Sequence, residues 1–412
     1  MRTLYLVPYT IDPPNSGTRV RALGIRAALD ALGVVTVAAL DEVARVDSWG
    51  AMCRAMVARR GTIKTRVLDR SRATLFGTPA LLERALAAGA IDAFRVLLST
   101  SDPELVVLSR PCFGPFIDAA RSTGASVVID ADESLVRAMG SVARSRAPAI
   151  QRLRAAMDGA NASRFERREY RRVDQVWVSS PVEQAYFAKL LPNGDVQAIP
   201  NLAPGSDSSV DDGAHTGRPT AIAFVGTYSY APNEEAALEL MRSIMPALDG
   251  VGLDLPLRII GRDPTPAMFR EAARHPKVGI TGTVDDPVSE LRRAGLTLVP
   301  IRSGAGSRIK ILEAMAAGVP VVSTSKGYEG LAVRPDLELL RAETSDEFAR
   351  ATLRLESDPA LRFQLVQAAR RFVEESHSQA AVSISVSNAV ASLGGRSDNS
   401  NDASRCGKCE ND

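Results

Sequence analysis

The stretch from Pro300 to Leu331 constrains the fold of this chain more than any other part of it. Residues 296–301 form a short apolar run that indicates a buried strand, and a loop of glycine and serine follows it. A helical pattern comes next and stops at Gly318, with Pro320 two residues later, before β-branched residues resume at 319–324. Strand, loop, helix and strand in this order predict one crossover unit of a parallel α/β sheet.

The helix in this stretch has an apolar side and a charged side. Ile309, Leu312 and Met315 repeat at helical spacing and make the apolar side. Lys310 and Glu313 fall together elsewhere on the helix. A helix N-terminus that opens from a glycine and serine loop attracts anions, because unpaired N–H groups and the helix dipole both favour negative charge. The pattern therefore predicts a ligand-bearing turn.

The residue types in this turn suit a nucleoside diphosphate. Arg308 and Lys310 supply positive charge for phosphates, and the Glu313 carboxylate can accept hydrogen bonds from the two hydroxyls of a ribose. The alternative is that Lys310 and Glu313 form a surface ion pair worth only about 0.2 to 0.5 kcal/mol, and that the glycines serve a tight turn. The chemistry of the loop favours the ligand site. The predicted loop contacts are Ser303, Gly304, Gly306 and Ser307.

The length of the chain indicates two domains. At 412 residues it is too long for one ordinary core, and a segment rich in Gly, Pro, Ser and Asp interrupts it near the middle. We predict an N-terminal domain at 1–201, a linker at 202–219, a C-terminal domain at 220–375, a terminal helix at 376–393 and a disordered polar tail at 394–412.

Strand and helix patterns alternate in both halves, which predicts doubly wound parallel sheets. In the first half the predicted strands are 3–7, 34–40, 63–68, 104–108, 125–129, 175–179 and 196–199. In the second half they are 221–226, 256–260, 277–281, 296–301, 319–324 and 337–341. Glycines end the first three of these, at Gly226, Gly261 and Gly282. The carboxyl ends of such strands line the ligand crevice of an open α/β sheet.

Composition and charge exclude several classes of protein. Apolar content of 45%, 24% charged residues and a net charge of +2 are typical of a soluble globular protein, and the overall charge gives no reason to expect nucleic acid as a partner. The four cysteines are scattered, and Cys406 with Cys409 supplies only two of the four ligands of a zinc site. No apolar run approaches the roughly 18 residues of a membrane span, so any membrane role would be peripheral. We therefore expect a cytoplasmic protein.

An acidic cluster follows the predicted strand at 125–129. Asp130, Asp132 and Glu133 stand at its carboxyl end, where open α/β sheets bind ligands. Three roles are open for it. In the first, the D-x-D pair would hold a divalent metal against a diphosphate. In the second, Asp132 or Glu133 would contact an acceptor. In the third, Asp132 would cap the next helix.

The segment at 137–172 is unusually rich in arginine. A basic helical face of this kind suits an anionic membrane surface or an anionic acceptor. The alternative is a solvated face that is partly paired along the helix. The arginines are 137, 144, 146, 152, 154, 164, 167, 168, 171 and 172, and the acids in or near the segment are Asp158, Glu166, Glu169 and Asp174.

Three motifs of the second half occur together in one known family. They are FVGTYSYAPNEEAA at 224–237, ITGTVDD at 280–286 and GAGSRIKILEAMAAGVPVVSTSKGYEGL at 304–331. Together they resemble the nucleotide-sugar half of family 4-type glycosyltransferases, also called glycosyl transferases group 1, over about 221–372. Over 1–201 the likeness is one of topology more than of motif. The resemblance implies the GT-B fold, an α/β fold of two doubly wound Rossmann-like domains that face each other across a cleft.

The resemblance also implies an activity and a set of contacts. The activity is that of a hexosyltransferase, which moves a sugar from a nucleotide-diphosphate sugar to an acceptor hydroxyl with retention of configuration. The nucleotide sugar is a co-substrate, and neither a metal nor another cofactor is implied. Gly226 and Thr227 would lie near the sugar or phosphates, Arg262 near the phosphates, and Thr283 with Val284 near the base.

Catalytic and acceptor-side roles follow from the same resemblance. Arg308 and Lys310 would stabilise the departing diphosphate, with Asp132 on the acceptor side. Gly17, in the turn after the first strand, would face the donor diphosphate. We expect the acceptor to be a glycan, a lipid-linked sugar or a small molecule. We also expect peripheral contact with an anionic membrane and no nucleic acid partner.

The sequence departs from the family pattern at three places. Ser16 stands where a second glycine is usual, and Tyr228 stands where relatives have a basic residue after the first-strand glycine. Ala305 replaces a glutamate that many relatives have eight residues before Glu313. The usual contact to the donor sugar is missing, so the identity of the sugar does not carry over. Two alternatives share this architecture, a nucleotide-sugar epimerase and a non-catalytic protein that binds a sugar or nucleotide.

Overall fold

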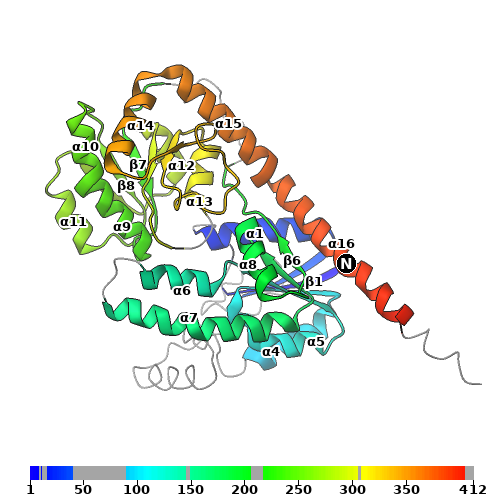
Figure 1. The fold of residues 1–412 in the computed structure, drawn as a ribbon. Coiled ribbons are helices and arrows are strands. Elements are labelled where there is room, and N and C mark those ends of the chain that lie inside the picture. The colour runs from blue at the N-terminus through cyan, green and yellow to red at the C-terminus, as the bar shows by residue number, and fades with distance from the viewer. Residues whose placement is uncertain are drawn as a thin grey trace, which may run out of the picture. The chain divides into compact units, whose positions relative to one another are not determined.

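The computed structural model in Figure 1 describes residues 1–8, 11, 16–39, 90–144, 149–205, 217–304 and 308–403. Contacts divide the chain into two compact units. The first combines Met1–Gly140, Leu153–Asn201 and the chain from Gln379 onwards, and the second combines Ser141–Arg152 with Leu202–Ser378. The predicted strand at 63–68 lies outside the described residues.

The first unit is built around a parallel sheet in the order β2-β1-β3-β4-β5-β6. The strands are β1 (Arg2–Val7), β2 (Val34–Ala39), β3 (Leu105–Ser109), β4 (Ser126–Asp132), β5 (Gln175–Val178) and β6 (Val196–Ala198). The helices are α1 (Gly17–Asp30), α4 (Ala90–Ser101), η1 (Pro111–Phe116), α5 (Ile117–Arg121), α6 (Leu135–Arg144), α7 (Ala149–Glu169), η2 (Tyr170–Arg172), α8 (Pro181–Leu190) and α16 (Gln379–Ala403). Because helices flank the sheet, its strands bury both faces, and Leu4 to Val7 in β1 expose no surface.

The second unit is built around a parallel sheet in the order β12-β11-β10-β7-β8-β9. The strands are β7 (Ile222–Val225), β8 (Leu257–Ile260), β9 (Val278–Gly282), β10 (Thr297–Val299), β11 (Val321–Ser323) and β12 (Leu340–Arg341). The helices are α9 (Ala231–Glu239), η3 (Leu240–Ile244), α10 (Met245–Gly250), α11 (Pro266–Ala272), α12 (Pro287–Ala294), α13 (Ile309–Ala316), α14 (Ser345–Ser357) and α15 (Pro359–His377). The predicted architecture of two doubly wound, Rossmann-like sheets is confirmed.

Two element boundaries differ from those that the sequence predicts. Strand β4 continues through Asp130 and Asp132 instead of ending before them, because a shift of register between these two residues keeps the chain paired with β5. Helix α16 ends at Ala403, ten residues beyond the predicted end of the terminal helix at 393. Glycine costs a helix only about 1 kcal/mol, and Gly394 therefore does not stop this one. Residues 404–412 lie outside the described part of the chain.

Helix α16 packs against the first unit, although it follows the second in sequence. The Gln379 side-chain amide donates to the Gly24 carbonyl oxygen of α1 at 3.0 Å. Farther along the helix, the Gln175 amide of β5 donates to the Ala389 carbonyl oxygen at 3.0 Å. These contacts join both ends of the chain in one unit. Among the described residues, no helix is long and apolar enough to cross a membrane.

A buried ion pair fixes the carboxyl edge of the first sheet. Arg21 of α1 and Asp130 of β4 are 2% and 1% exposed, and the guanidinium nitrogen NH2 lies 2.6 Å from Oδ1. The NH1 group of Arg21 donates to the Ile199 carbonyl oxygen at 2.8 Å and to Asn201 Oδ1 at 2.9 Å. One side chain therefore ties α1 to β4 and to the segment that follows β6. Such a pair is tolerated only when its remaining hydrogen-bonding groups are satisfied.

We predict that Arg21→Met destabilises the first unit by about 3 to 5 kcal/mol, because it leaves the Asp130 carboxylate buried and unpaired. The measurement is urea unfolding followed by tryptophan fluorescence, since both tryptophans, Trp49 and Trp177, belong to the N-terminal half of the sequence. Arg26→Met removes a pair with the 45%-exposed Asp30 and should cost less than about 1 kcal/mol. Equal losses in the two variants would contradict the role of the buried pair.

Candidate functional site

Strands β7 and β8 are each followed by a glycine, Gly226 and Gly261, at a position with little room for a side chain. Gly261 has φ of +133°, and a Cβ atom there would lie 1.8 Å from the carbonyl oxygen of Gly226. A Cβ on Gly226 would lie 3.1 Å from the Asn233 amide nitrogen. Only glycine lets these strand ends approach so closely. The packing of the unit thus explains both residues before any ligand is considered.

The side-chain amide of Asn233 joins β7 to α13. Its nitrogen donates to the Thr227 carbonyl oxygen at 2.9 Å, and its oxygen accepts from Lys310 Nζ at 2.5 Å. The same ammonium group lies 4.5 Å from the centre of the Phe224 ring, which attracts a cation through its π electrons. Lys310 is therefore held by a neutral amide and an aromatic face.

Lys310 and Glu313 are both poised to change charge near neutral pH. Burial lowers the pKa of Lys310 to about 7, with a further lowering from Arg308 and an opposing effect from Glu313. Burial raises the pKa of Glu313 to about 7, and Lys310 opposes this. No ion pair joins Lys310 to Glu313 in the described part of the chain, which disfavours the reading of the two as a surface pair. Titratable groups shifted in this way are typical of functional sites.

Arg308 is a second cation at the start of α13, and its surroundings differ from those of Lys310. It is only 7% exposed, and its NH2 lies 3.6 Å from the Glu329 carboxylate. Its Nε donates to the Glu329 carbonyl oxygen at 3.3 Å. Glu329 also pairs with Lys326. Glu329 therefore partly compensates the charge of Arg308. No carboxylate in the described part of the chain lies at hydrogen-bonding distance from Lys310.

The loop before α13 approaches the helix α9 region closely. Gly304 has φ of +94°, and a Cβ there would lie 2.6 Å from the Tyr230 hydroxyl oxygen and 3.0 Å from Pro232. The Ser303 hydroxyl donates to the Glu235 carboxylate at 3.0 Å. Both predicted loop residues thus lie beside the turn that leads into α9. The predicted contacts Gly306 and Ser307 lie outside the described residues.

The remaining predicted donor contacts of the second unit follow the carboxyl ends of β7, β8 and β9. Arg262 NH2 lies 3.5 Å from Thr227 Oγ1, so these two residues are neighbours. Thr283 and Val284 follow β9, where Thr283 is exposed and Val284 packs partly against the core. The second unit therefore brings Thr227, Arg262 and Lys310 to one sheet edge, with Thr283 and Val284 on the neighbouring strand end.

Gly17 and Asp132 belong to the first unit, and their predicted roles toward donor and acceptor remain predictions. Gly17 is the first residue of α1, and the Ser16 hydroxyl before it accepts from the Arg19 amide at 3.4 Å. The loop that precedes Ser16 is described only at Pro8 and Ile11.

Asp132 occupies a strained position at the carboxyl edge of the first sheet. It is 2% exposed, has φ of +59°, and its Oδ2 lies 3.2 Å from Arg110 NH2. Arg110 follows β3 and has φ of +87°. Left-handed backbone in residues other than glycine costs free energy and gathers at functional sites. The alternative of Asp132 as a helix cap is wrong, because the Ser134 hydroxyl accepts from the Arg137 amide at the start of α6.

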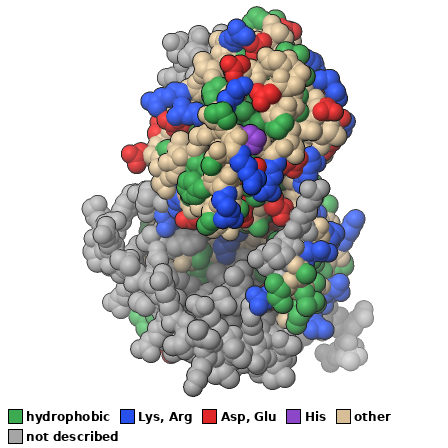
Figure 2. All heavy atoms as spheres, turned by 90° about the vertical axis from the view of Figure 1, so that its left-hand side faces the viewer, with side chains coloured by type: hydrophobic (Ala, Val, Ile, Leu, Met, Phe, Trp, Pro, Cys, Tyr) green, Lys and Arg blue, Asp and Glu red, His purple; other side chains and the backbone are tan. Residues whose placement is uncertain are grey.

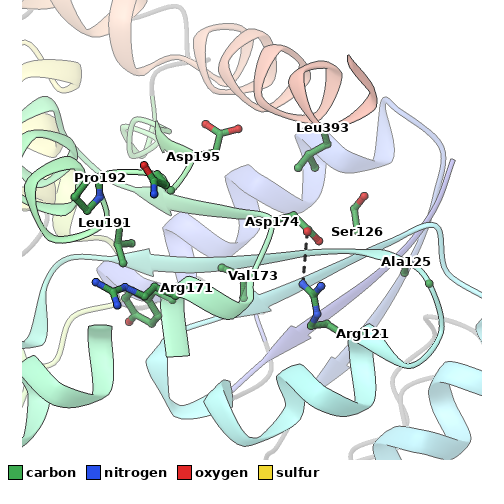
Figure 3. A pocket seen from close by; sticks show the side chains of 14 residues that line it. Arg121, Ala125, Ser126, Arg171, Val173, Asp174, Leu191, Pro192, Asp195 and Leu393 are labelled. Carbon is green, nitrogen blue, oxygen red and sulfur yellow. Dashed lines mark ion pairs between the residues drawn. The ribbon is translucent and has the colours of Figure 1, made fainter. Parts of the chain in front are cut away.

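A pocket of about 850 Å³ lies at the opposite, amino edge of the first sheet (Figure 3). Ser126 at the start of β4 lines it, as do Asp174 and Asp195, which precede β5 and β6. Arg121 points toward Asp174, and the two form an ion pair at 3.6 Å. No predicted site residue lines this pocket. Among the described residues, no cluster of three or more His, Cys, Asp or Glu side chains could hold a metal ion.

Three residues that sequence reasoning missed matter to this geometry. Asn233 fixes Lys310, Glu329 compensates Arg308, and Arg110 pairs with Asp132. A signal existed for each. Asn233 lies inside the 224–237 motif, Glu329 inside the 304–331 motif, and Arg110 directly after an apolar strand.

A comparison with known protein families finds a match within the second unit. Residues 219–358 match the family model described as glycosyl transferases group 1. No curated protein matches the chain. The match covers the strands β7 to β12 and with them Thr227, Arg262, Lys310 and Glu313.

Solved structures show the same fold over nearly the whole chain. Sucrose-phosphate synthase from Thermosynechococcus elongatus matches with a TM-score of 0.72 and 17% identity, over 96% of this chain and 100% of that one. The apo form of the lipopolysaccharide outer core galactosyltransferase WaaB matches with a TM-score of 0.60 and 14% identity, over 95% and 99%. Anabaena Alr3699/HepE in complex with UDP-glucose gives 0.60 and 13%, over 95% and 99%. The chain therefore has the two-domain GT-B fold, and its residues 219–358 match the glycosyl transferases group 1 family.

Proposed function

We propose that this chain moves a sugar from a nucleotide-diphosphate sugar to an acceptor hydroxyl. The observation that carries the proposal is Lys310, a cation held at the start of α13 by the neutral Asn233 amide. Among the described residues no carboxylate lies at hydrogen-bonding distance from Lys310, so a bound anion would be the group that stabilises its charged form. A diphosphate is the anion that fits best, since Arg308 and the N-terminus of α13 add positive potential beside it.

The difficult step of sugar transfer is the departure of the diphosphate. Negative charge develops on the leaving phosphate, and donors fixed in advance stabilise it without reorganisation. Lys310 and Arg308 supply that charge in our proposal, with Arg262 beside Thr227 as a further contact. Fixed cations of this kind support transfer without a metal ion. We propose retention of configuration, as the resemblance to the family implies. The acceptor hydroxyl would attack from the face that the diphosphate leaves, so the leaving phosphate itself takes the proton of that hydroxyl.

Glu313 is the proposed partner of the ribose. It follows Lys310 by three residues, so both side chains lie on one side of α13. A carboxylate can accept from both hydroxyls of a vicinal diol. The UDP-glucose complex of Anabaena Alr3699/HepE makes UDP-glucose the first donor to test.

The acceptor side of the proposal rests on the first unit. Asp132 and Arg110 place a charged pair at the carboxyl edge of that sheet, and Gly17 begins the helix on the same edge. We propose that Asp132 contacts the acceptor and that Gly17 approaches the donor diphosphate. The acceptor remains a glycan, a lipid-linked sugar or a small molecule, and the reaction would take place in the cytoplasm.

We predict that Glu313→Ala weakens the binding of UDP-glucose about 10- to 100-fold, because a charged hydrogen-bond acceptor is lost. Isothermal titration calorimetry measures this directly. The matched control is Glu374→Ala, which removes an exposed carboxylate of α15 and should leave the affinity unchanged. Unchanged affinity in Glu313→Ala would refute the assignment of the ribose.

We predict that UDP-glucose binding changes its proton linkage in sign near pH 7. At pH 8 free Lys310 is mostly neutral, and nearby phosphate raises its pKa, so binding takes up protons. At pH 6 Glu313 is mostly protonated, and the ribose hydroxyls favour its carboxylate, so binding releases protons. Calorimetry in buffers of different ionisation enthalpy measures both. Lys310→Arg should abolish only the uptake, and Glu313→Gln only the release.

Incubation with donor alone separates transfer from the alternatives. We expect slow release of free sugar at most, with turnover rising when an acceptor is added from a panel of glycans, lipid-linked sugars and small molecules. An epimerase would instead convert the donor to another nucleotide sugar without any acceptor. Tight nucleotide binding with no consumption of any UDP-, GDP- or dTDP-sugar would indicate a non-catalytic binding protein.

A further inference from the structure

Helix α7 buries two of its acidic side chains and exposes several of its arginines. Glu166 and Glu169 are 0% and 5% exposed, on the side that also buries Ala162 and Phe165. Glu166 accepts from the Leu135 amide at 2.6 Å and from the Ser134 hydroxyl at 3.1 Å, so it caps the start of α6. Glu169 pairs with Arg168 and Arg172, so it compensates these two arginines, while Glu166 is occupied by the start of α6.

The outward side of α7 carries arginines without acidic partners. In a helix, residues three or four apart share one face, so Arg164 and Arg167 lie together with Arg171 of η2 at the end of the row. Arg154, Arg164, Arg167 and Arg171 are exposed and form no ion pair in the described part of the chain. The face therefore has a surplus of positive charge, unlike a solvated face that is paired along the helix.

The same outward side exposes large apolar side chains. Leu153 and Met157 are 59% and 56% exposed, and they are one turn apart. Ile150, at the beginning of the helix, is 55% exposed. Figure 2 shows hydrophobic side chains adjoining Lys and Arg side chains at the lower right of the face that it draws. Solvation alone explains arginines but gives no reason to expose a row of large apolar side chains.

We propose that the outward face of α7, defined by Leu153, Met157, Arg154, Arg164, Arg167 and Arg171, binds the surface of an anionic lipid bilayer. Arginines attract the phosphates of the headgroups, and the apolar side chains enter the boundary between headgroups and acyl chains. This combination is that of a helix that lies in the plane of the interface. A nucleic acid would match the arginines but not Leu153 and Met157. The proposal does not depend on the identity of the donor.

Flotation of the full chain with vesicles tests this surface. We expect binding to vesicles of phosphatidylcholine with about one third phosphatidylglycerol, weakened by salt, and little binding to phosphatidylcholine alone. R164Q/R167Q/R171Q should lower the partition coefficient about 100-fold, since each basic residue near an anionic surface contributes about fivefold. L153S/M157S should lower it by about tenfold and leave the salt dependence in place.

Matched variants make the outcome decisive. R270Q/R350Q/R371Q removes the same charge from exposed arginines of α11, α14 and α15 and should bind vesicles like the unchanged chain. Circular dichroism and thermal unfolding, measured in every variant, report whether the chain is folded, and neither measurement depends on the donor proposal. Equal binding to neutral vesicles, or equal losses in both arginine triples, would overturn the membrane surface. Absence of vesicle binding, with duplex DNA bound through the same three arginines, would overturn it in favour of nucleic acid.

Discussion

The neutral amide of Asn233 is the contact on which the candidate donor site depends. It fixes the end of β7 through the Thr227 carbonyl oxygen and fixes α13 through Lys310. A carboxylate at this position would hold the lysine more strongly, but it would also cancel the charge that a phosphate needs. An amide orients the ammonium group and leaves its charge uncancelled. The close approach of Gly226 to Asn233 makes the arrangement rigid, because the strand end and the amide pack in direct contact.

Buried charge serves different purposes in the two units. In the first, Arg21 is saturated by Asp130, Ile199 and Asn201, so it holds elements together and has no capacity left for a ligand. In the second, burial lowers the pKa of Lys310, which means that its charged form destabilises the ligand-free protein. A bound anion would remove that cost. The first arrangement stabilises a fold, and the second is the one on which the proposed donor site rests.

Sequence patterns predicted the strands of the second sheet and the turn before α13, because local hydrophobic period and glycine placement encode both. They could not predict which polar side chains meet. Asn233 and Lys310 are far apart in sequence, and so are Arg110 and Asp132, so tertiary packing alone brings each pair together. The role of Asp132 as a helix cap was wrong for a related reason. A bulge extends β4 through this residue, and Ser134 then begins the helix.

Residues of the family motifs are of two kinds in this structure. Some are needed for packing, and others are candidates for binding a ligand. Gly261 is required by the 1.8 Å approach that any Cβ would make to the Gly226 carbonyl oxygen, so it would be needed whatever the unit binds. Lys310 and Glu313 are the opposite case. Burial penalises the charged form of each, and an apolar or small residue at either position would avoid that penalty. Substitutions at these two positions therefore test the proposed ligand site, where substitutions at Gly261 would test only the fold.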